Sequence, residues 1–79
     1  MKVWIGNMKE GTTVEMVAQL LHKYGLPQPE RVLEVPEGAA PGMLLEFLTG
    51  DAERLRRLLW RIEGLYWNGS HLMVTPMHF

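Results

Sequence analysis

Apolar and polar residues alternate in short stretches of this chain and recur at helical spacing in two longer ones. At the start, a period of two places Val3 and Ile5 on one face of a half-buried strand and Lys2, Trp4 and Gly6 on the other. Further strands are predicted, from their Val, Leu and Met content and from the turns beside them, at residues 30–35, 42–48 and 71–75.

Two helices are predicted between these strands. The first begins at Thr12, which forms a capping-box pattern with Glu15 three residues later. It ends at Gly25, because glycine accepts the left-handed capping conformation and the prolines that follow, Pro27 and Pro29, cannot continue a helix. Its apolar residues at helical spacing are Val14, Val17, Leu20, Leu21 and Tyr24.

The second helix opens at Thr49-Gly50-Asp51 and closes at Gly64. A hairpin turn is predicted at the dipeptide Asn68-Gly69, which leads into the last strand. Residues 36–41 are too rich in Gly, Ala and Pro to pair, and we predict a loop there. The apolar stripe of this second helix is Ala52, Leu55, Leu58, Leu59 and Ile62.

The order strand, helix, strand, strand, helix, strand predicts the fold class. Two right-handed crossovers fold it into a four-stranded antiparallel sheet with both helices on one face. We therefore predict an α+β fold, a ferredoxin-like βαββαβ sandwich, that occupies residues 1–79 as a single domain. A chain of 79 residues has room for one such core.

Composition limits the class of protein. With 47% apolar and 22% charged residues, the chain has the composition of a folded domain. The absence of cysteine excludes disulfides and fits an intracellular protein, either cytoplasmic or nuclear. No apolar run approaches the roughly 20 residues that span a bilayer, so we expect no membrane partner. A net charge of -1 provides no long-range attraction toward phosphate.

The sequence resembles an RNA-recognition motif (RRM) over nearly its whole length. The first-strand motif of that family is apolar, aromatic, apolar, any residue, Asn, Leu. Residues 3–8, Val-Trp-Ile-Gly-Asn-Met, match it in all but the last position, where Met8 is a conservative replacement. The resemblance implies that the ligand is single-stranded RNA, that Trp4 stacks on a base, and that Asn7 is the asparagine of the motif.

The third-strand motif of the family is matched only in part. That motif is basic, Gly, aromatic, small, aromatic, apolar, any, aromatic, and aligning its last residue with Phe47 places Ala40 at the basic position. Gly42 and Leu44 stand at two aromatic positions, and Phe47 points into the core by alternation. The resemblance therefore implies weak binding of RNA, or binding as one module of a larger protein.

The sheet face away from the helices is the predicted RNA-binding surface. We also expect Glu46, Thr75 and, from the neighbouring strand, Glu34 on this face, where the two glutamates would repel a phosphate backbone. Because this face is so apolar, it also suits a protein partner or a second copy of the chain. A structural alternative is that Phe79 of the same chain covers Trp4. The predicted RNA contacts are Lys2, Trp4, Asn7, Leu44, His71 and Met73.

The second helix carries four of the eight Lys and Arg residues. At about 100° per residue, Arg54, Arg57 and Arg61 gather on the face opposite the apolar stripe, with Trp60 beside them. This pattern predicts a second patch, for an acidic partner or for RNA phosphates, with an ordinary solvated face as the alternative. The alternative to RNA binding is thus that the chain is a non-classical RRM. Such a domain would bind a protein or self-associate, through the sheet face or through this helix.

No pattern in the sequence indicates catalysis, a metal or a cofactor. The histidines His22, His71 and His78 lack ligand spacing, and there is no cysteine to complete a zinc site. The segment 6–11 lacks the lysine and hydroxyl residue that end a phosphate-binding loop. We therefore predict a binding domain that is not an enzyme and that needs no cofactor.

Overall fold

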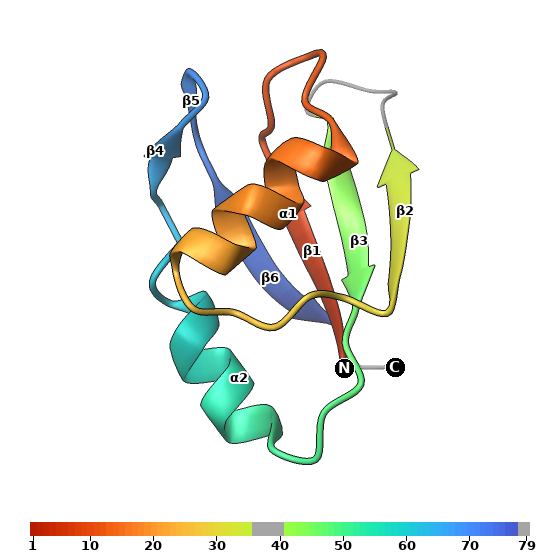
Figure 1. Cartoon of the computed structure of the whole chain (residues 1–79). Helices are drawn as coiled ribbons and strands as arrows, with labels where there is room; N and C mark the ends of the chain where they lie inside the picture. Colours follow the sequence, from red (N-terminus) through yellow and green to blue (C-terminus); the bar gives the residue numbers. More distant parts are fainter. Residues whose placement is uncertain (36–40, 78–79) are drawn as a thin grey trace.

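The elements of the fold follow the predicted order, with one additional hairpin (Figure 1). The computed structural model of the chain describes residues 1–35 and 41–77. The predicted loop at 36–41 lies outside the described residues apart from Pro41, and so does the predicted contact of Phe79. The elements are β1 (Lys2–Gly6), α1 (Val14–Lys23), β2 (Arg31–Val35), β3 (Gly42–Glu46), α2 (Ala52–Leu59), β4 (Tyr66–Trp67), β5 (Ser70–His71) and β6 (Met73–Met77).

Four of the strands form one antiparallel sheet in the order β2-β3-β1-β6. In Figure 1, α1 crosses one face of this sheet and α2 packs toward its lower end on the same side. The short strands β4 and β5 pair only with each other. The predicted α+β class and ferredoxin-like βαββαβ topology are confirmed.

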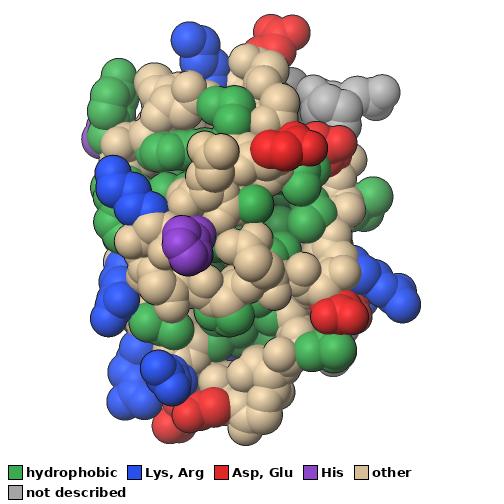
Figure 2. All heavy atoms as spheres, in the orientation of Figure 1, with side chains coloured by type: hydrophobic (Ala, Val, Ile, Leu, Met, Phe, Trp, Pro, Cys, Tyr) green, Lys and Arg blue, Asp and Glu red, His purple; other side chains and the backbone are tan. Residues whose placement is uncertain are grey.

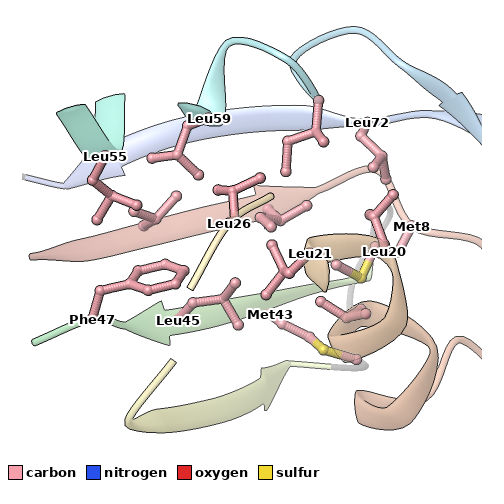
Figure 3. Close-up of a cluster of buried hydrophobic side chains, with 14 residues drawn as sticks. Met8, Leu20, Leu21, Leu26, Met43, Leu45, Phe47, Leu55, Leu59 and Leu72 are labelled. Atoms are coloured by element: carbon pink, nitrogen blue, oxygen red, sulfur yellow. The ribbon is translucent and has the colours of Figure 1, made fainter. Parts of the chain in front are cut away.

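The core lies between the helices and one face of the sheet (Figure 3). Val3 and Ile5 of β1 are fully buried at 0% exposure, as their alternation predicts. Met1 and Phe47 exchange two backbone hydrogen bonds of 2.8 Å, which extends the β1–β3 ladder and turns Phe47 into the core. The helices contribute Val17, Leu20, Leu21, Leu55 and Leu59.

The start of α1 is one residue later than the capping-box pattern predicts. The hydroxyl of Thr13 accepts a hydrogen bond from the backbone N–H of Met16 at 3.2 Å, and so Thr13 is the N-cap. The hydroxyl of Thr12 instead donates to the carbonyl oxygen of Lys9 at 2.6 Å. The pairing of Thr12 with Glu15 is therefore wrong, because the second of two adjacent threonines takes the capping role.

The end of α1 is the glycine cap that the sequence predicts. Gly25 has φ of +77°, its N–H donates to the carbonyl of His22, and the N–H of Leu26 donates to the carbonyl of Leu21. These two bonds are the Schellman arrangement, which satisfies carbonyls that the helix leaves unpaired. Leu26 is buried as a result and extends the core beyond the helix.

The second helix opens where it is predicted to, and Asp51 is its N-cap. Its Oδ1 accepts a hydrogen bond from the backbone N–H of Arg54 at 3.0 Å. The helix ends at Leu59, and turns continue as far as Gly64, which has φ of +72°. In the predicted apolar stripe, Leu55, Leu59 and Ile62 are buried, whereas Ala52 and Leu58 are half-buried.

The predicted Asn68-Gly69 turn is present, with φ of 50° and 86° at its two residues. It joins β4 to β5, where Tyr66 pairs with His71. Because His71 is already paired in this hairpin and the next residue, Leu72, is buried in the core, the final strand of the large sheet begins at Met73. The predicted start of that strand at residue 71 is wrong.

The outer edge of β6 has few free donors. The backbone N–H of Val74 donates to the carboxylate of Glu63, which follows α2. Pro76, two residues further along the same edge, has no N–H. An edge without free donors resists pairing with another strand.

We expect Asp51→Ala to lower the free energy of unfolding by about 1 kcal/mol, because the first turn of α2 loses its side-chain acceptor. Urea denaturation followed by far-ultraviolet circular dichroism measures this change. Asp51→Asn retains an oxygen acceptor and should stay near the wild-type stability. A loss of equal size in both variants would contradict the capping role.

Candidate functional site

The sheet face away from the helices is the candidate site, and the strand registers fix which side chains it carries. The pairs Leu33–Leu44, Leu44–Trp4 and Trp4–Thr75 form a row across all four strands. Residues two positions away along each strand belong to the same face. The open sheet face, as we call it, consists of Lys2, Trp4, Gly6, Arg31, Leu33, Val35, Gly42, Leu44, Glu46, Met73, Thr75 and Met77.

Trp4 lies at the centre of this face, with its indole over two glycines. A Cβ atom added at Gly6 would come within 2.5 Å of the indole Nε1. A Cβ added at Gly42 would come within 2.7 Å of Cη2 of the same ring and within 2.6 Å of the carbonyl oxygen of Ile5. The ring therefore lies against the backbone at both glycines, and any larger residue at either position would displace it.

This arrangement explains the departure from the third-strand motif at Gly42. An aromatic side chain at position 42 would occupy the space that the Trp4 ring fills. Trp4 is half-buried, so one surface of the indole meets the sheet while part of the ring is accessible. Among the described residues of the open sheet face, Trp4 is thus the one aromatic side chain, and glycines on two adjacent strands support it.

The central row continues the apolar surface toward β2. Leu33 is 59% exposed, and Leu44 between it and Trp4 is half-buried. Met73, which pairs with Gly6 on the other side, is 58% exposed. The predicted positions of Trp4, Leu44 and Met73 on one face are confirmed.

The charged residues of the open sheet face form a row at one end. Glu46 pairs with Lys2 on one side and with Arg31 on the other. The register places Glu34 opposite Met43, which is buried on the helix side, so the predicted position of Glu34 on this face is wrong. The residues that β2 contributes instead, Arg31, Leu33 and Val35, were missed because the consecutive apolar residues Val32 and Leu33 leave the phase of this strand ambiguous in the sequence.

Asn7 and His71 are joined by a hydrogen bond, and neither belongs to a strand of the large sheet. The side-chain amide of Asn7, a residue with φ of +59°, donates to the backbone carbonyl of His71 at 2.7 Å. The His71 ring lies at the β4–β5 hairpin, with its centroid 5.0 Å from that of Tyr66 and its Nδ1 3.1 Å from the carbonyl oxygen of Gly64. The expectation that His71 projects from the open sheet face is therefore wrong, and the Asn7 amide joins the loop after β1 to β5.

The predicted patch on α2 divides into two parts. Arg54, Arg57 and Arg61 are all exposed and, with Leu58, line one shallow hollow. Figure 2 shows Lys and Arg side chains gathered on the side of the molecule where α2 lies. The Nη1 atom of Arg61 donates to the carbonyl oxygen of Tyr24 at 3.1 Å, at the end of α1.

Trp60 lies on the other side of α2 from this hollow. It is 69% exposed and faces the edge of the large sheet, where it lines a small notch with Arg56, Val74 and Pro76. Trp60 is therefore not part of the surface that the three arginines form. The helical spacing of the sequence predicted that Trp60 lies beside the arginines. That spacing does not show which side of the helix meets β6.

The charged and polar side chains of the described residues lie at the surface or are only partly covered. None of the charged or polar side chains in residues 1–35 and 41–77 is buried. In the same part of the chain, no three His, Asp or Glu side chains are grouped so that they could hold a metal ion. Neither of the two described helices is long and apolar enough to span a bilayer.

The architecture defines the class of this protein as a ferredoxin-like α+β domain with the topology of an RRM-like fold. No protein-family model matches the sequence, and no curated protein matches it either. The assignment of this class therefore depends on the strand order, the helix placement and the open sheet face.

Gly42→Ala tests the packing of Trp4. We expect a loss of about 1–3 kcal/mol in the free energy of unfolding, because the added methyl group overlaps both the indole and the Ile5 carbonyl. Tryptophan fluorescence during urea denaturation measures the stability and reports the environment of the ring.

Gly50→Ala is the matched control for this variant, because a Cβ atom there meets nothing within 4 Å. It should leave both the stability and the fluorescence close to those of the wild type. Equal stability of the two alanine variants would show that the indole does not lie against Gly42.

Proposed function

We propose that the open sheet face binds single-stranded RNA weakly, with one base stacked on Trp4. The observation that carries this proposal is the indole of Trp4, which lies against the backbone at Gly6 and at Gly42 and is only half-buried. Stacking of a base on an aromatic side chain contributes about 1–3 kcal/mol and tolerates any base, since every base has a π-face. The proposed activity is binding and includes no catalytic step.

The flanking residues support a short binding site. Leu33 and Leu44 offer apolar contacts beside the stacked base, and Lys2 and Arg31 place two cations at one end of the face. Glu46 lies between the two cations in the register and reduces their attraction for phosphate. With about two phosphates neutralised, the logarithm of the affinity should fall with the logarithm of salt concentration with a slope of about -1.4.

Trp4→Ala tests the stacking directly. We expect the affinity for a pool of short single-stranded RNAs at low salt to fall at least about fivefold. This is the loss that corresponds to about 1 kcal/mol, the lower limit for the stacking of one base. The three tryptophans of the chain provide three indole signals for NMR, of which that of Trp4 should shift in the wild-type protein.

Trp60→Ala is the control, because Trp60 is exposed at the edge of the sheet, away from the open sheet face. Its RNA affinity should equal that of the wild type. Unchanged affinity in Trp4→Ala, or shifts confined to the Trp60 indole and its neighbours, would rule out the sheet as the RNA-binding surface.

Self-association through the same face is the second candidate function. The observation that favours it is the exposure of two large apolar side chains, Leu33 and Met73, on opposite sides of Trp4. Burial of these side chains against a second copy of the chain would remove apolar surface from water. In that case RNA and the second copy compete for Trp4.

Two substitutions on β2 separate these functions. Arg31→Glu should weaken RNA binding, because it exchanges a phosphate contact for a repulsive charge, and should leave self-association little changed. Leu33→Lys should abolish self-association, because it places a charge in the apolar contact. RNA binding should remain detectable, because the variant loses an apolar contact to the base but gains a cation for phosphate. Sedimentation velocity measures self-association, and fluorescence anisotropy with labelled RNA measures RNA binding. A monomer at every concentration would exclude the self-association alternative.

A further inference from the structure

The α2 side of the molecule has a groove that is separate from the open sheet face. One part is a hollow of about 550 Å³ between the loop after α1 and the beginning of α2. It adjoins a second hollow of about 330 Å³ lined by Arg54, Arg57, Leu58 and Arg61, since the two share Arg54 and Leu58. We call the two hollows together the α2 groove.

The inner part of the α2 groove is apolar. Its lining includes Leu26 and Leu55, which are buried, and the half-buried side chain of Leu58. Pro27 borders the same hollow from the loop after α1. An aliphatic side chain placed there would bury apolar surface on both molecules.

The outer part of the α2 groove is cationic. Arg61 is positioned by its hydrogen bond to the Tyr24 carbonyl, which occupies one of five guanidinium N–H donors and leaves the others available. None of the three groove arginines forms an ion pair with a described residue. Asp51, the acidic residue of the lining, has its Oδ1 in the cap of α2. The local charge thus favours a carboxylate ligand.

We propose that the α2 groove binds an acidic protein segment that places one aliphatic side chain between its carboxylates. Arg54 lies in α2 and Arg61 in the turns that follow its end at Leu59, so seven residues at a rise of about 1.5–2.0 Å each separate them by roughly 10–12 Å. About three residues of an extended chain span that length, so carboxylates on both sides of a central Leu reach both arginines. The described lining contains no aromatic ring on which a base could stack, and this favours a peptide over RNA.

A short synthetic peptide with Asp and Glu on both sides of one Leu is the probe, and NMR of the intact protein is the measurement. We expect shifts at the amides of Gly50, Leu55 and Leu58 that disappear at high salt. A peptide with Asn and Gln in place of the acids should cause no shift, and a peptide with Ser in place of Leu should bind more weakly.

Charge reversal at matched positions completes the test. Arg57→Glu should weaken binding of the acidic peptide at least about tenfold, because a groove cation becomes repulsive. Arg56→Glu makes the same change of charge one residue away, on the side of α2 that faces β6, and should change the affinity less than about twofold.

Three results would overturn the proposal. The first is the absence of shifts with the acidic peptide, and the second is equal weakening by Arg57→Glu and Arg56→Glu, which would indicate unspecific attraction to α2. The third is tighter binding of a uridine oligonucleotide than of the peptide at the same amides. RNA binding at Trp4 has its own signals, so failure here leaves the proposal for the open sheet face unaffected.

Discussion

The alternation of side chains along β1 is the constraint on which both the core and the open sheet face depend. This strand pairs with β3 on one side and with β6 on the other, so its register fixes the rows of the whole sheet. Val3 and Ile5 lie beneath the helices at 0% exposure, and Trp4 between them lies on the opposite face. A slip of one residue would exchange the two faces and bury the tryptophan while exposing the core. Stability and the proposed stacking surface therefore depend on the same five residues.

The glycine at position 42, where the RRM motif has an aromatic residue, and the position of the Trp4 ring depend on each other. A sheet that stacks several bases needs several aromatic side chains standing on adjacent strands. Here the glycines at positions 6 and 42 let a single indole approach the backbone of two strands. The result is a platform with a fixed orientation, which lowers the entropy that the side chain loses when a ligand stacks on it. No second aromatic ring fits in the space that the indole occupies, and for this reason the proposed stacking involves one base.

The sequence predicted most of the fold because its strongest signals are local. The start of the second helix at Thr49-Gly50-Asp51, the left-handed glycine at Gly25 and the Asn68-Gly69 turn each depend on interactions within a few residues. The errors arise where a choice depends on distant contacts. Glu34 was placed on the wrong face because only pairing with β3 sets the phase of β2, and His71 was assigned to the last strand because the extent of the β4–β5 hairpin is not visible locally. The orientation of the Trp4 ring and the separation of Trp60 from the arginines depend on tertiary packing, which no spacing rule contains.

The net charge of -1 conceals an uneven distribution of charge. In Figure 2 most of the basic side chains in view lie on the side of α2, whereas most acidic side chains lie toward β2 and the upper end of the sheet. A domain of this size is comparable in width to a few Debye lengths at physiological salt, so a ligand at one surface feels mainly the charges nearest to it. The local field at the α2 groove is thus set by its arginines, and that at the open sheet face by the row of Lys2, Glu46 and Arg31.

Because the groove lies on the helix side and Trp4 on the opposite face of the sheet, occupation of one surface leaves the other accessible. A partner that carried both an RNA segment and an acidic segment would bind the two surfaces at once, and its affinity would exceed that of either segment alone.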